Sequence, residues 1–223
     1  MKLQTLRRSA GIATAAVALS LSLAACGDDA DDTNASDNNG SSETTDNGDT
    51  SAEGAAAQTF GDGCAQVPAD GAGSFDGMVK DPVATAASNN PLLTQLVGAV
   101  GAVDGLGDTL NSAEALTGFA PYDGAFAEIP KKDLNGLVAG AKKDGQKSAL
   151  AKILTHHVLG ANDDPAAVVG EQDTLAGDQL TIEGDENGMT VSDGTVTANV
   201  LCGNVPTANA TVYVIDKVLT GVK

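Results

Sequence analysis

The sequence predicts an α+β domain that follows an N-terminal export signal and an acidic linker. Two observations predict this fold class. Apolar residues recur at helical spacing through the middle of the chain, and apolar and polar residues alternate at strand spacing in the final third. Helices followed by antiparallel strands are typical of the α+β class. A shift in composition near residue 60 marks the start of the domain.

The first 25 residues have the layout of a signal peptide. Lys2, Arg7 and Arg8 give a positive start, and an uncharged, Ala- and Leu-rich run follows that is too short for a good membrane span. Residues 23–26 read LAAC and resemble a bacterial lipobox, which predicts that Cys26 is acylated, with palmitate-type chains, and becomes the first mature residue. The alternative is an ordinary cleavage site beside a buried or disulfide-bonded cysteine. The general secretory route fits better than the twin-arginine route.

Residues 26–59 are predicted to be a lipidated cysteine followed by a disordered linker. Residues 27–59 contain nine acids and no Lys or Arg, and Ser, Thr, Asn, Gly and Ala make up most of the rest. Such a segment has too little apolar surface to offset the entropy cost of ordering. As a flexible coil it would reach roughly 30 Å from the membrane.

Composition limits what the domain at residues 60–223 can bind. It holds nine lysines, no arginine and 21 acids. So acidic a domain is a poor candidate for binding nucleic acid or anionic lipid. Its two cysteines, Cys64 and Cys202, would lie outside the cytoplasm, where disulfides persist, so we expect one bridge between them. Two free buried thiols are the alternative. No cluster of residues at metal-ligand spacing accompanies them, and no metal or cofactor is expected.

The middle of the chain reads as a series of helices interrupted once by a strand. Residues 81–88 predict a helix with Asp81 as N-cap and Pro82 in its first turn, and residues 92–100 predict a second helix after a break. The Gly-rich segment 101–112 is read as a connection. The remaining predictions here are a strand at 115–121 and helices at 122–130, 134–140 and 146–158.

The final third predicts antiparallel strands within 174–184, 189–203 and 210–219, with turns at Gly184, Gly188 and Gly194. Residues 183–188 also mimic the start of an EF-hand calcium loop. The twelfth position of that loop needs a bidentate Glu and is Gly194 instead, so a hairpin turn is the better interpretation.

His156 and His157 are the only histidines. Neighbours on a helix diverge by about 100°, so the two cannot readily bind one metal ion. His157 shares an apolar face with Leu150, Ile153 and Leu154, which predicts a buried, hydrogen-bonded structural residue, whereas His156 should face the other way and matter less. The alternative is a general base close to Asp163 or Asp164. No nucleophile motif or phosphate loop accompanies it, so no catalytic residue is assigned and the chain is not expected to be an enzyme.

Three segments resemble the conserved segments of fasciclin domains. They are LTGFAPYDGAF at residues 116–126, ILTHHV at 153–158 and NATVYVIDKVL at 209–219, and together they cover most of residues 92–219. The export signal and the cysteine pair are similar to the single-domain, secreted or lipid-anchored fasciclin antigens of actinobacteria. This resemblance implies a β-sandwich wedge decorated by several α-helices.

The resemblance also implies roles for individual residues. It gives a set of structural motif positions: Phe119, Pro121, Phe126, His157, Asn209 and Asp216. Phe119 and Phe126 would be core, as would Ala120, Val212, Val214 and Ile215, and Asp216 would be a structural hydrogen-bonding residue. The chain departs from the family pattern at three places: Gly118 replaces a β-branched residue, His156 replaces a Tyr, and Asn204-Val205 replaces the Asp-Ile pair of integrin-binding animal domains.

These observations predict a cell-surface lipoprotein that acts as an adhesion or interaction module. It would be held on the extracytoplasmic face of the cell membrane by the lipid on Cys26, with a shed or secreted form as a second location. Its partner would be a surface or matrix protein or polysaccharide. The alternative is a carrier that binds an apolar or lipid ligand between the wedge and the helices. A large apolar cavity would favour the carrier, and a close-packed wedge would favour the adhesion module.

Overall fold

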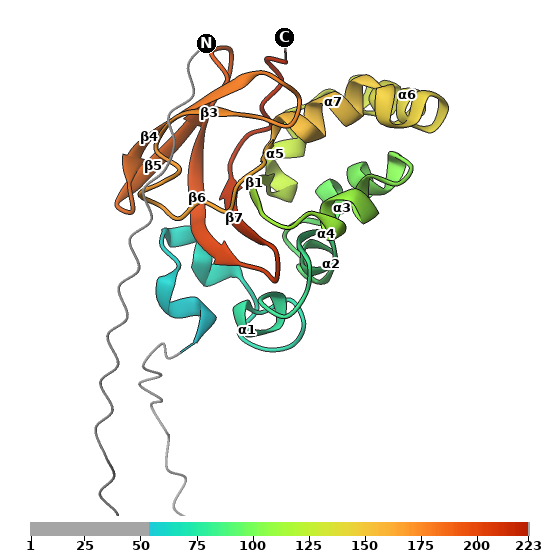
Figure 1. Ribbon diagram of the computed structural model, residues 1–223. Helices are drawn as coiled ribbons and strands as arrows, with labels where there is room; N and C mark the ends of the chain where they lie inside the picture. The colour runs from blue at the N-terminus through green and yellow to red at the C-terminus, as the bar shows by residue number, and fades with distance from the viewer. Residues whose placement is uncertain (1–53, 223) are drawn as a thin grey trace, which may run out of the picture. The chain divides into compact units, whose positions relative to one another are not determined.

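One seven-stranded sheet organises residues 54–222, the part of the chain that the computed structural model describes (Figure 1). The predictions for the signal peptide, for Cys26 and for most of the linker therefore lie outside the described residues. The strands lie in the order β2-β1-β7-β6-β5-β4-β3. Their bounds are β1 Leu116–Pro121, β2 Val158–Leu159, β3 Gly170–Asp173, β4 Gln179–Asp185, β5 Gly188–Ser192, β6 Thr197–Pro206 and β7 Ala210–Ile215.

The two edges of this sheet meet. Strands β3 to β7 pair antiparallel in succession, β1 pairs parallel with β7, and β2 pairs antiparallel with β1. Leu159 of β2 then bridges Thr174, just after β3, and the N–H of Leu175 donates to the carbonyl of Val158 at 2.8 Å. The sheet thus closes on itself, and its exposed edges are largely removed.

Short helices cover the outer face of the sheet around β1, β6 and β7 (Figure 1). The α-helices are α1 Phe75–Met78, α2 Val83–Asn89, α3 Thr94–Ala102, α4 Leu106–Ser112, α5 Asp123–Phe126, α6 Lys131–Asp144 and α7 Ala149–His156. The 3-10 helices are η1 Ala55–Gln58, η2 Asp62–Gln66 and η3 Gly145–Lys147. The predicted α+β class, with several helices around a wedge of strands, is confirmed.

Alternation along the strands divides the apolar side chains between two sides of the sheet. In β7, Tyr213 and Ile215 point into the closed interior, whereas Val212 and Val214 point out towards the helices. The interior core also contains Phe119 of β1 and Leu219 from the C-terminal segment. All six residues that the family resemblance places in the core are buried.

Several local elements differ from the predictions. The segment read as a connection contains α4, which begins after Gly105 in the left-handed conformation (φ 72) and buries Leu106. A glycine tolerates this conformation without steric cost, and this lets the chain turn sharply into a new helix. Short β2 and the polar edge strand β3 were not predicted, because neither shows alternation of apolar residues over a useful length.

The N-cap of α2 was predicted wrongly. Pro82, and not Asp81, occupies the N-cap, and it has no side chain that could cap the helix. The Oδ1 atom of Asn209 accepts from the N–H of Val83 at 2.9 Å, and the Oδ1 of Asn111 accepts from that of Ala84 at 2.9 Å. The first orphan donors of α2 are thus satisfied by residues remote in sequence, which local rules cannot foresee.

The domain begins slightly earlier than predicted and contains the expected disulfide. Residues 54–59, assigned to the linker, form η1 and its flanks, and Gln58 accepts a hydrogen bond from Asn204 Nδ2 at 2.8 Å. Cys64 of η2 is bonded to Cys202 of β6. Within residues 54–222, no helix has the length and hydropathy needed to cross a membrane.

Candidate functional site

His157 is buried and uses both ring nitrogens within the fold. It follows the last residue of α7 and is 4% exposed. Its Nδ1 lies 2.8 Å from the carbonyl of Ile153, and its Nε2 accepts from the N–H of Leu219 at 2.9 Å. A carbonyl can only accept and a backbone N–H can only donate, so the ring is the neutral tautomer with its proton on Nδ1.

Burial lowers the pKa of His157 from 6.5 to about 4. Desolvation is the main cause and neighbouring His156 adds to it, whereas the Ile153 carbonyl and Asp193 act in the opposite direction. The ring is therefore neutral near pH 7, and it has no lone pair or proton left over for a substrate.

The rings of His156 and His157 lie edge to face, with their centroids 6.0 Å apart and an angle of 88° between their planes. His156 is as deeply buried as His157, with 1% of its surface accessible. Its Nδ1 lies 2.6 Å from Asp178 Oδ1, and its Nε2 lies 3.7 Å from Asp193 Oδ2 without a hydrogen bond. The structure therefore gives His156 a buried polar role comparable to that of His157. The expectation that His156 matters less than His157 has no support in these contacts.

Asp193 links this cluster to the C-terminal segment. Its carboxylate accepts hydrogen bonds from the backbone N–H groups of Thr195, Val196 and Gly221 at 2.6–2.7 Å. Burial acts to raise the pKa of Asp193, but these three donors and His156 outweigh burial and lower it. Leu219 and Gly221 are thus held by two polar side chains, Leu219 by His157 and Gly221 by Asp193.

The histidine rings contact Asp178, the Ile153 carbonyl and the Leu219 N–H, and the candidate partners Asp163 and Asp164 are not among these groups. The backbone N–H of Asp163 donates to Thr117 Oγ1 at 2.9 Å, and the side chain of Asp164 accepts from two N–H groups of its own turn. Within residues 54–222, no group of three or more His, Cys, Asp or Glu side chains is arranged to hold a metal ion. Residues 183–188, considered as a calcium loop, belong to the β4–β5 hairpin.

Asn209 joins three segments of the helical layer. Besides capping α2 at Val83, its Nδ2 donates to the carbonyls of Leu110 and Ala113 at 2.9 Å each. One side chain thus provides hydrogen-bond partners for backbone groups at the start of α2 and at the end of α4. Sequence reasoning identified the position only through the family resemblance, because the partners lie about a hundred residues away.

The other motif residues also have structural contacts. Asp216 accepts from the backbone and side-chain N–H groups of Asn199 at 2.7 and 2.6 Å, joining β7 to β6. Asp123, a position missed by sequence reasoning, caps α3 by accepting from Gln95 N–H at 2.8 Å and from the Thr94 hydroxyl. Pro121 ends β1 opposite Ile215, and Phe126 is buried at the end of α5.

The most distinctive charged surface lies on α6. We call Lys131, Lys132, Lys142 and Lys143 the α6 lysine face. They form two pairs of neighbours, Lys131–Lys132 and Lys142–Lys143, and the second pair follows the first by eleven residues. Eleven residues make three helical turns to within about 20°, so the two pairs project from the same side of the helix, about 16 Å apart along its axis. All four are exposed, whereas Ala141 is buried on the opposite side of the helix. None of the four forms an ion pair with a carboxylate in the described part of the chain.

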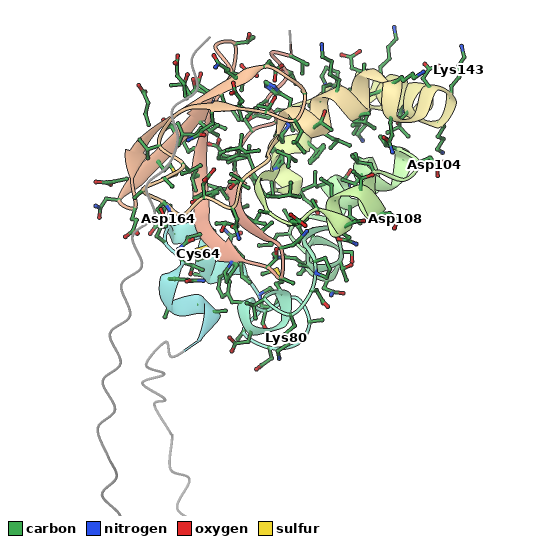
Figure 2. The ribbon with its side chains drawn as sticks, viewed as in Figure 1. Cys64, Lys80, Asp104, Asp108, Lys143 and Asp164 are labelled. Atoms are coloured by element: carbon green, nitrogen blue, oxygen red, sulfur yellow. A yellow bond between two sulfur atoms is a disulfide. The ribbon has the colours of Figure 1, made fainter. Side chains whose placement is uncertain are left out.

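The charge of this face is opposite to that of the rest of the domain. Residues 131–152 hold six lysines and two acids, whereas the remainder of residues 60–223 holds three lysines and 19 acids. Figure 2 shows Lys143 at the far end of α6, on the opposite side of the domain from Lys80 near α1. Since charges are screened beyond about 8 Å in physiological salt, a partner close to α6 meets this local positive charge.

Comparison with known proteins identifies the family. The fasciclin domain model matches residues 91–221. The chain is 44% identical over 172 residues to the immunogenic protein MPB70 of Mycobacterium bovis, covering 74% of this chain and 83% of that protein. It is 43% identical over 171 residues to the cell surface glycolipoprotein MPB83 of the same species, covering 74% and 73%.

A solved structure shares the fold. A FAS1 domain pair from the insect cell adhesion molecule fasciclin I aligns with a TM-score of 0.53 at 16% identity, covering 66% of this chain and 54% of that one. Together with the three conserved segments and the helix-covered closed sheet, these matches lead to one conclusion. The chain belongs to the fasciclin domain family.

Proposed function

We propose that this protein is a lipid-anchored adhesion module of the cell surface, and that it binds an acidic polysaccharide through the α6 lysine face. The names of its relatives support the general role: one is a cell surface glycolipoprotein, and the fold neighbour is a cell adhesion molecule. The observation that carries the specific role is the α6 lysine face itself, a positive surface on a strongly acidic domain.

The proposed anchor is a diacylglycerol carried on the sulfur of Cys26. Residues 1–25 have the order of charge, apolar run and small residues that precedes a lipidated cysteine. A diacylglycerol joined to the sulfur by a thioether bond supplies two acyl chains, which suffice for stable attachment where one chain does not. Residues 27–53, rich in acids and small polar residues, would act as a tether that holds the domain about 30 Å from the membrane.

The composition of the lysine face favours a polyanion over a folded protein. The residues between the two lysine pairs on this side are Asn135, Gly136 and Ala139, so the face has no arginine and no aromatic side chain. Protein–protein interfaces are enriched in aromatic residues and Arg and depleted in Lys. Lysines at regular spacing on a smooth helix instead suit a flexible chain of negative charges, whose counterions are released on binding.

The two histidines support a binding role over a catalytic one. Both are buried, and both rings contact internal groups of the fold. A catalytic base needs access to a substrate proton at hydrogen-bond distance. We therefore assign the histidines to stability, and we propose no reaction.

Binding of the unlipidated mature chain, residues 27–223, to immobilised hyaluronate tests the proposal, with neutral dextran as the control surface. Hyaluronate should be bound, dextran should not, and affinity should fall steeply with added salt. Lys142→Gln/Lys143→Gln should weaken binding, whereas the matched double variant Lys80→Gln/Lys217→Gln, which removes the same charge elsewhere, should not. Equal losses in the two variants, or equal binding to duplex DNA, would mean nonspecific attraction and contradict the proposal.

A separate experiment tests the anchor. Cys26→Ser should release the protein from the membrane fraction or leave its precursor uncleaved. Unchanged processing together with unchanged membrane retention would exclude lipidation at this cysteine.

A further inference from the structure

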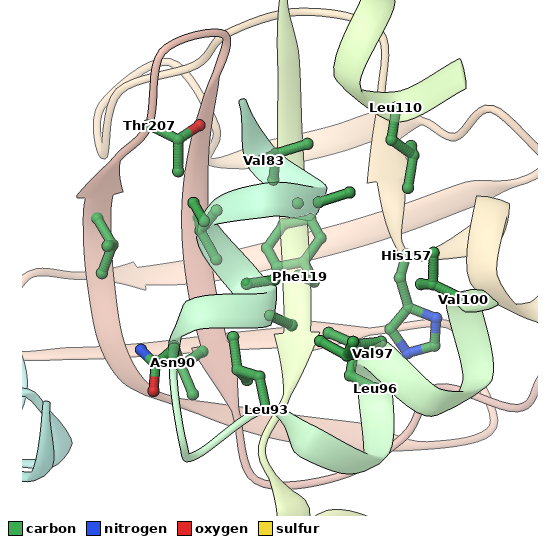
Figure 3. Close-up of a pocket in the computed structure, with 18 of the residues that line it drawn as sticks. Val83, Asn90, Leu93, Leu96, Val97, Val100, Leu110, Phe119, His157 and Thr207 are labelled. Atoms are coloured by element: carbon green, nitrogen blue, oxygen red, sulfur yellow. The ribbon is translucent and has the colours of Figure 1, made fainter. Parts of the chain in front are cut away.

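An apolar cavity of about 110 Å³ lies between the outer face of the sheet and the helices (Figure 3). Four residues of β1 line it, namely Leu116, Gly118, Phe119 and Ala120. Opposite them stand side chains of α2 and α3, including Val83, Leu93, Leu96, Val97 and Val100. The cavity therefore lies where the sheet and the helical layer should pack most closely.

Gly118 is the reason that this space is open. A Cβ atom built at Gly118 would meet no other atom within 4 Å, although its strand neighbours Val158 and Val212 both line the cavity. Gly118 also remains partly exposed in the middle of a strand that is otherwise buried. A β-branched side chain, which the family pattern has here, would fill this space.

The polar groups that line the cavity are already used. Asn90 donates to Met78 Sδ and accepts from Leu92 N–H, and the Thr207 hydroxyl exchanges hydrogen bonds with Ala210. His157 is held on both ring nitrogens. A ligand with a polar group inside the cavity would find no partner for it, and burying an unpaired polar group is costly. The cavity therefore selects an apolar group.

The β1 residues that line the cavity extend from Leu116 to Ala120, about 13 Å along the strand. Three residues, Leu96, Leu154 and His157, also line a second cavity of about 400 Å³, which is bounded by Phe126, Leu134 and Val218. These three side chains thus lie between the two cavities. An engineered apolar cavity of about 150 Å³ accepts benzene, so a slim apolar group fits a space of this size.

We propose that this cavity binds the end of an aliphatic acyl chain of a membrane lipid, with the terminal methyl group beside Gly118. An unbranched chain can run along the lining residues of β1 and needs no polar partner inside. The polar head of the lipid stays outside, because no unused polar group lines the cavity. The membrane as the source of the lipid rests on the proposed anchor at Cys26, whereas the binding site itself does not.

Titration of the unlipidated mature chain, residues 27–223, with methyl-¹³C dodecanoic acid tests the site by NMR. The expected result is saturable binding with contacts from the labelled methyl group to Val212 and Leu93. Gly118→Val should fill the space, raise the melting temperature and weaken binding by about tenfold or more, because several CH₂ groups lose their burial. Gly118→Ala should give a smaller loss of affinity and serves if the Val variant does not fold.

Gly188→Val is the matched control, since Gly188 is also a strand glycine with open space around its Cβ position but does not line the cavity. It should bind like the wild type. Absence of binding by the wild type, or equal binding by Gly118→Val, overturns the proposal. Binding that is lost once the chain carries its own lipid would mean that the anchor fills the cavity, and would overturn the assignment to a separate lipid. The Lys142→Gln/Lys143→Gln variant should retain dodecanoate binding, which separates this test from that of the polysaccharide site.

Discussion

The ring of His157 holds the C-terminal segment in place: its Nε2 accepts a hydrogen bond from the N–H of Leu219 at 2.9 Å. The side chain of Leu219 is fully buried in the interior of the sheet. Two residues beyond, Gly221 is bound by Asp193, which lies beside His156. His157 and Asp193 therefore hold the C-terminal segment against the rest of the domain.

Replacement of either histidine should lower stability. His157→Ala removes the acceptor of Leu219 N–H and should reduce the free energy of unfolding by about 1–3 kcal/mol. His156→Ala should have a similar effect, because it takes a buried partner from Asp178 at 2.6 Å. Denaturant unfolding of both variants checks this, together with hyaluronate binding at a temperature where each remains folded. A His157→Ala protein with unchanged stability and no binding would show that the histidine belongs to a functional site.

Acid should destabilise the domain through His157 in a defined pH window. The unfolded chain takes up a proton near pH 6.5, whereas the folded chain takes it up only near pH 4. The free energy of unfolding should therefore fall as the pH drops from 6.5 towards 4, and this contribution should level off below pH 4. The difference between the two pKa values corresponds to roughly 3 kcal/mol.

His157→Gln isolates this effect, because Gln does not titrate. His156, Asp178 and Asp193 remain in both proteins, so the difference between the two stability curves reports the titration of His157. We expect the curves to converge as the pH falls from 6.5 to 4. Curves that stay parallel through this window would mean that His157 is protonated in the folded state at its ordinary pKa.

Asn209→Ala should be among the most destabilising polar substitutions. It removes three hydrogen bonds, to Val83, Leu110 and Ala113, and leaves partly buried backbone groups at the ends of α2 and α4 without these partners. We expect a loss of about 2–4 kcal/mol. Asn135→Ala, at an exposed position on α6, is the control and should change stability by less than about 0.5 kcal/mol. Equal effects at the two positions would contradict the capping role of Asn209.

The disulfide should contribute strongly to stability. Cys64 and Cys202 are 138 residues apart in sequence, so the bond closes a long loop of the unfolded chain. The double variant Cys64→Ser/Cys202→Ser should lose up to about 5 kcal/mol on the chain-entropy estimate. Thermal unfolding with and without reductant measures the loss. Two thiols that can be alkylated in the unfolded, unreduced protein would show that the bond does not form.

Local patterns predicted much of the fold, and long-range contacts account for what they missed. The strands in the last third were visible because apolar residues alternate along β4 to β7, and α7 because Leu150, Ile153 and Leu154 share one face. The parallel pairing of β1 with β7 leaves no local signal, since it depends on a crossover through much of the domain. The capping of α2 by Asn209 and of α3 by Asp123 is hidden for the same reason.

The candidate sites were less predictable than the fold. The burial of His157 followed from its apolar neighbours, but the contact of His156 with Asp178 depends on the closure of the sheet, which brings the β3–β4 turn to the end of α7. The α6 lysine face could have been predicted from the eleven-residue spacing of the two lysine pairs. It was missed because the domain was judged by its overall negative charge. The cavity beside Gly118 could be found only in the structure, because the sequence does not show whether neighbouring side chains fill the space that a glycine leaves.

The most direct test of the proposed function uses whole cells that display the lipidated protein. Retention of these cells on a hyaluronate-coated surface under flow should exceed retention on dextran and should fall in high salt. Replacement of Lys131, Lys132, Lys142 and Lys143 with Gln should reduce retention to the dextran level at equal surface expression. Retention on hyaluronate that is unchanged by the four substitutions would contradict adhesion through the α6 lysine face.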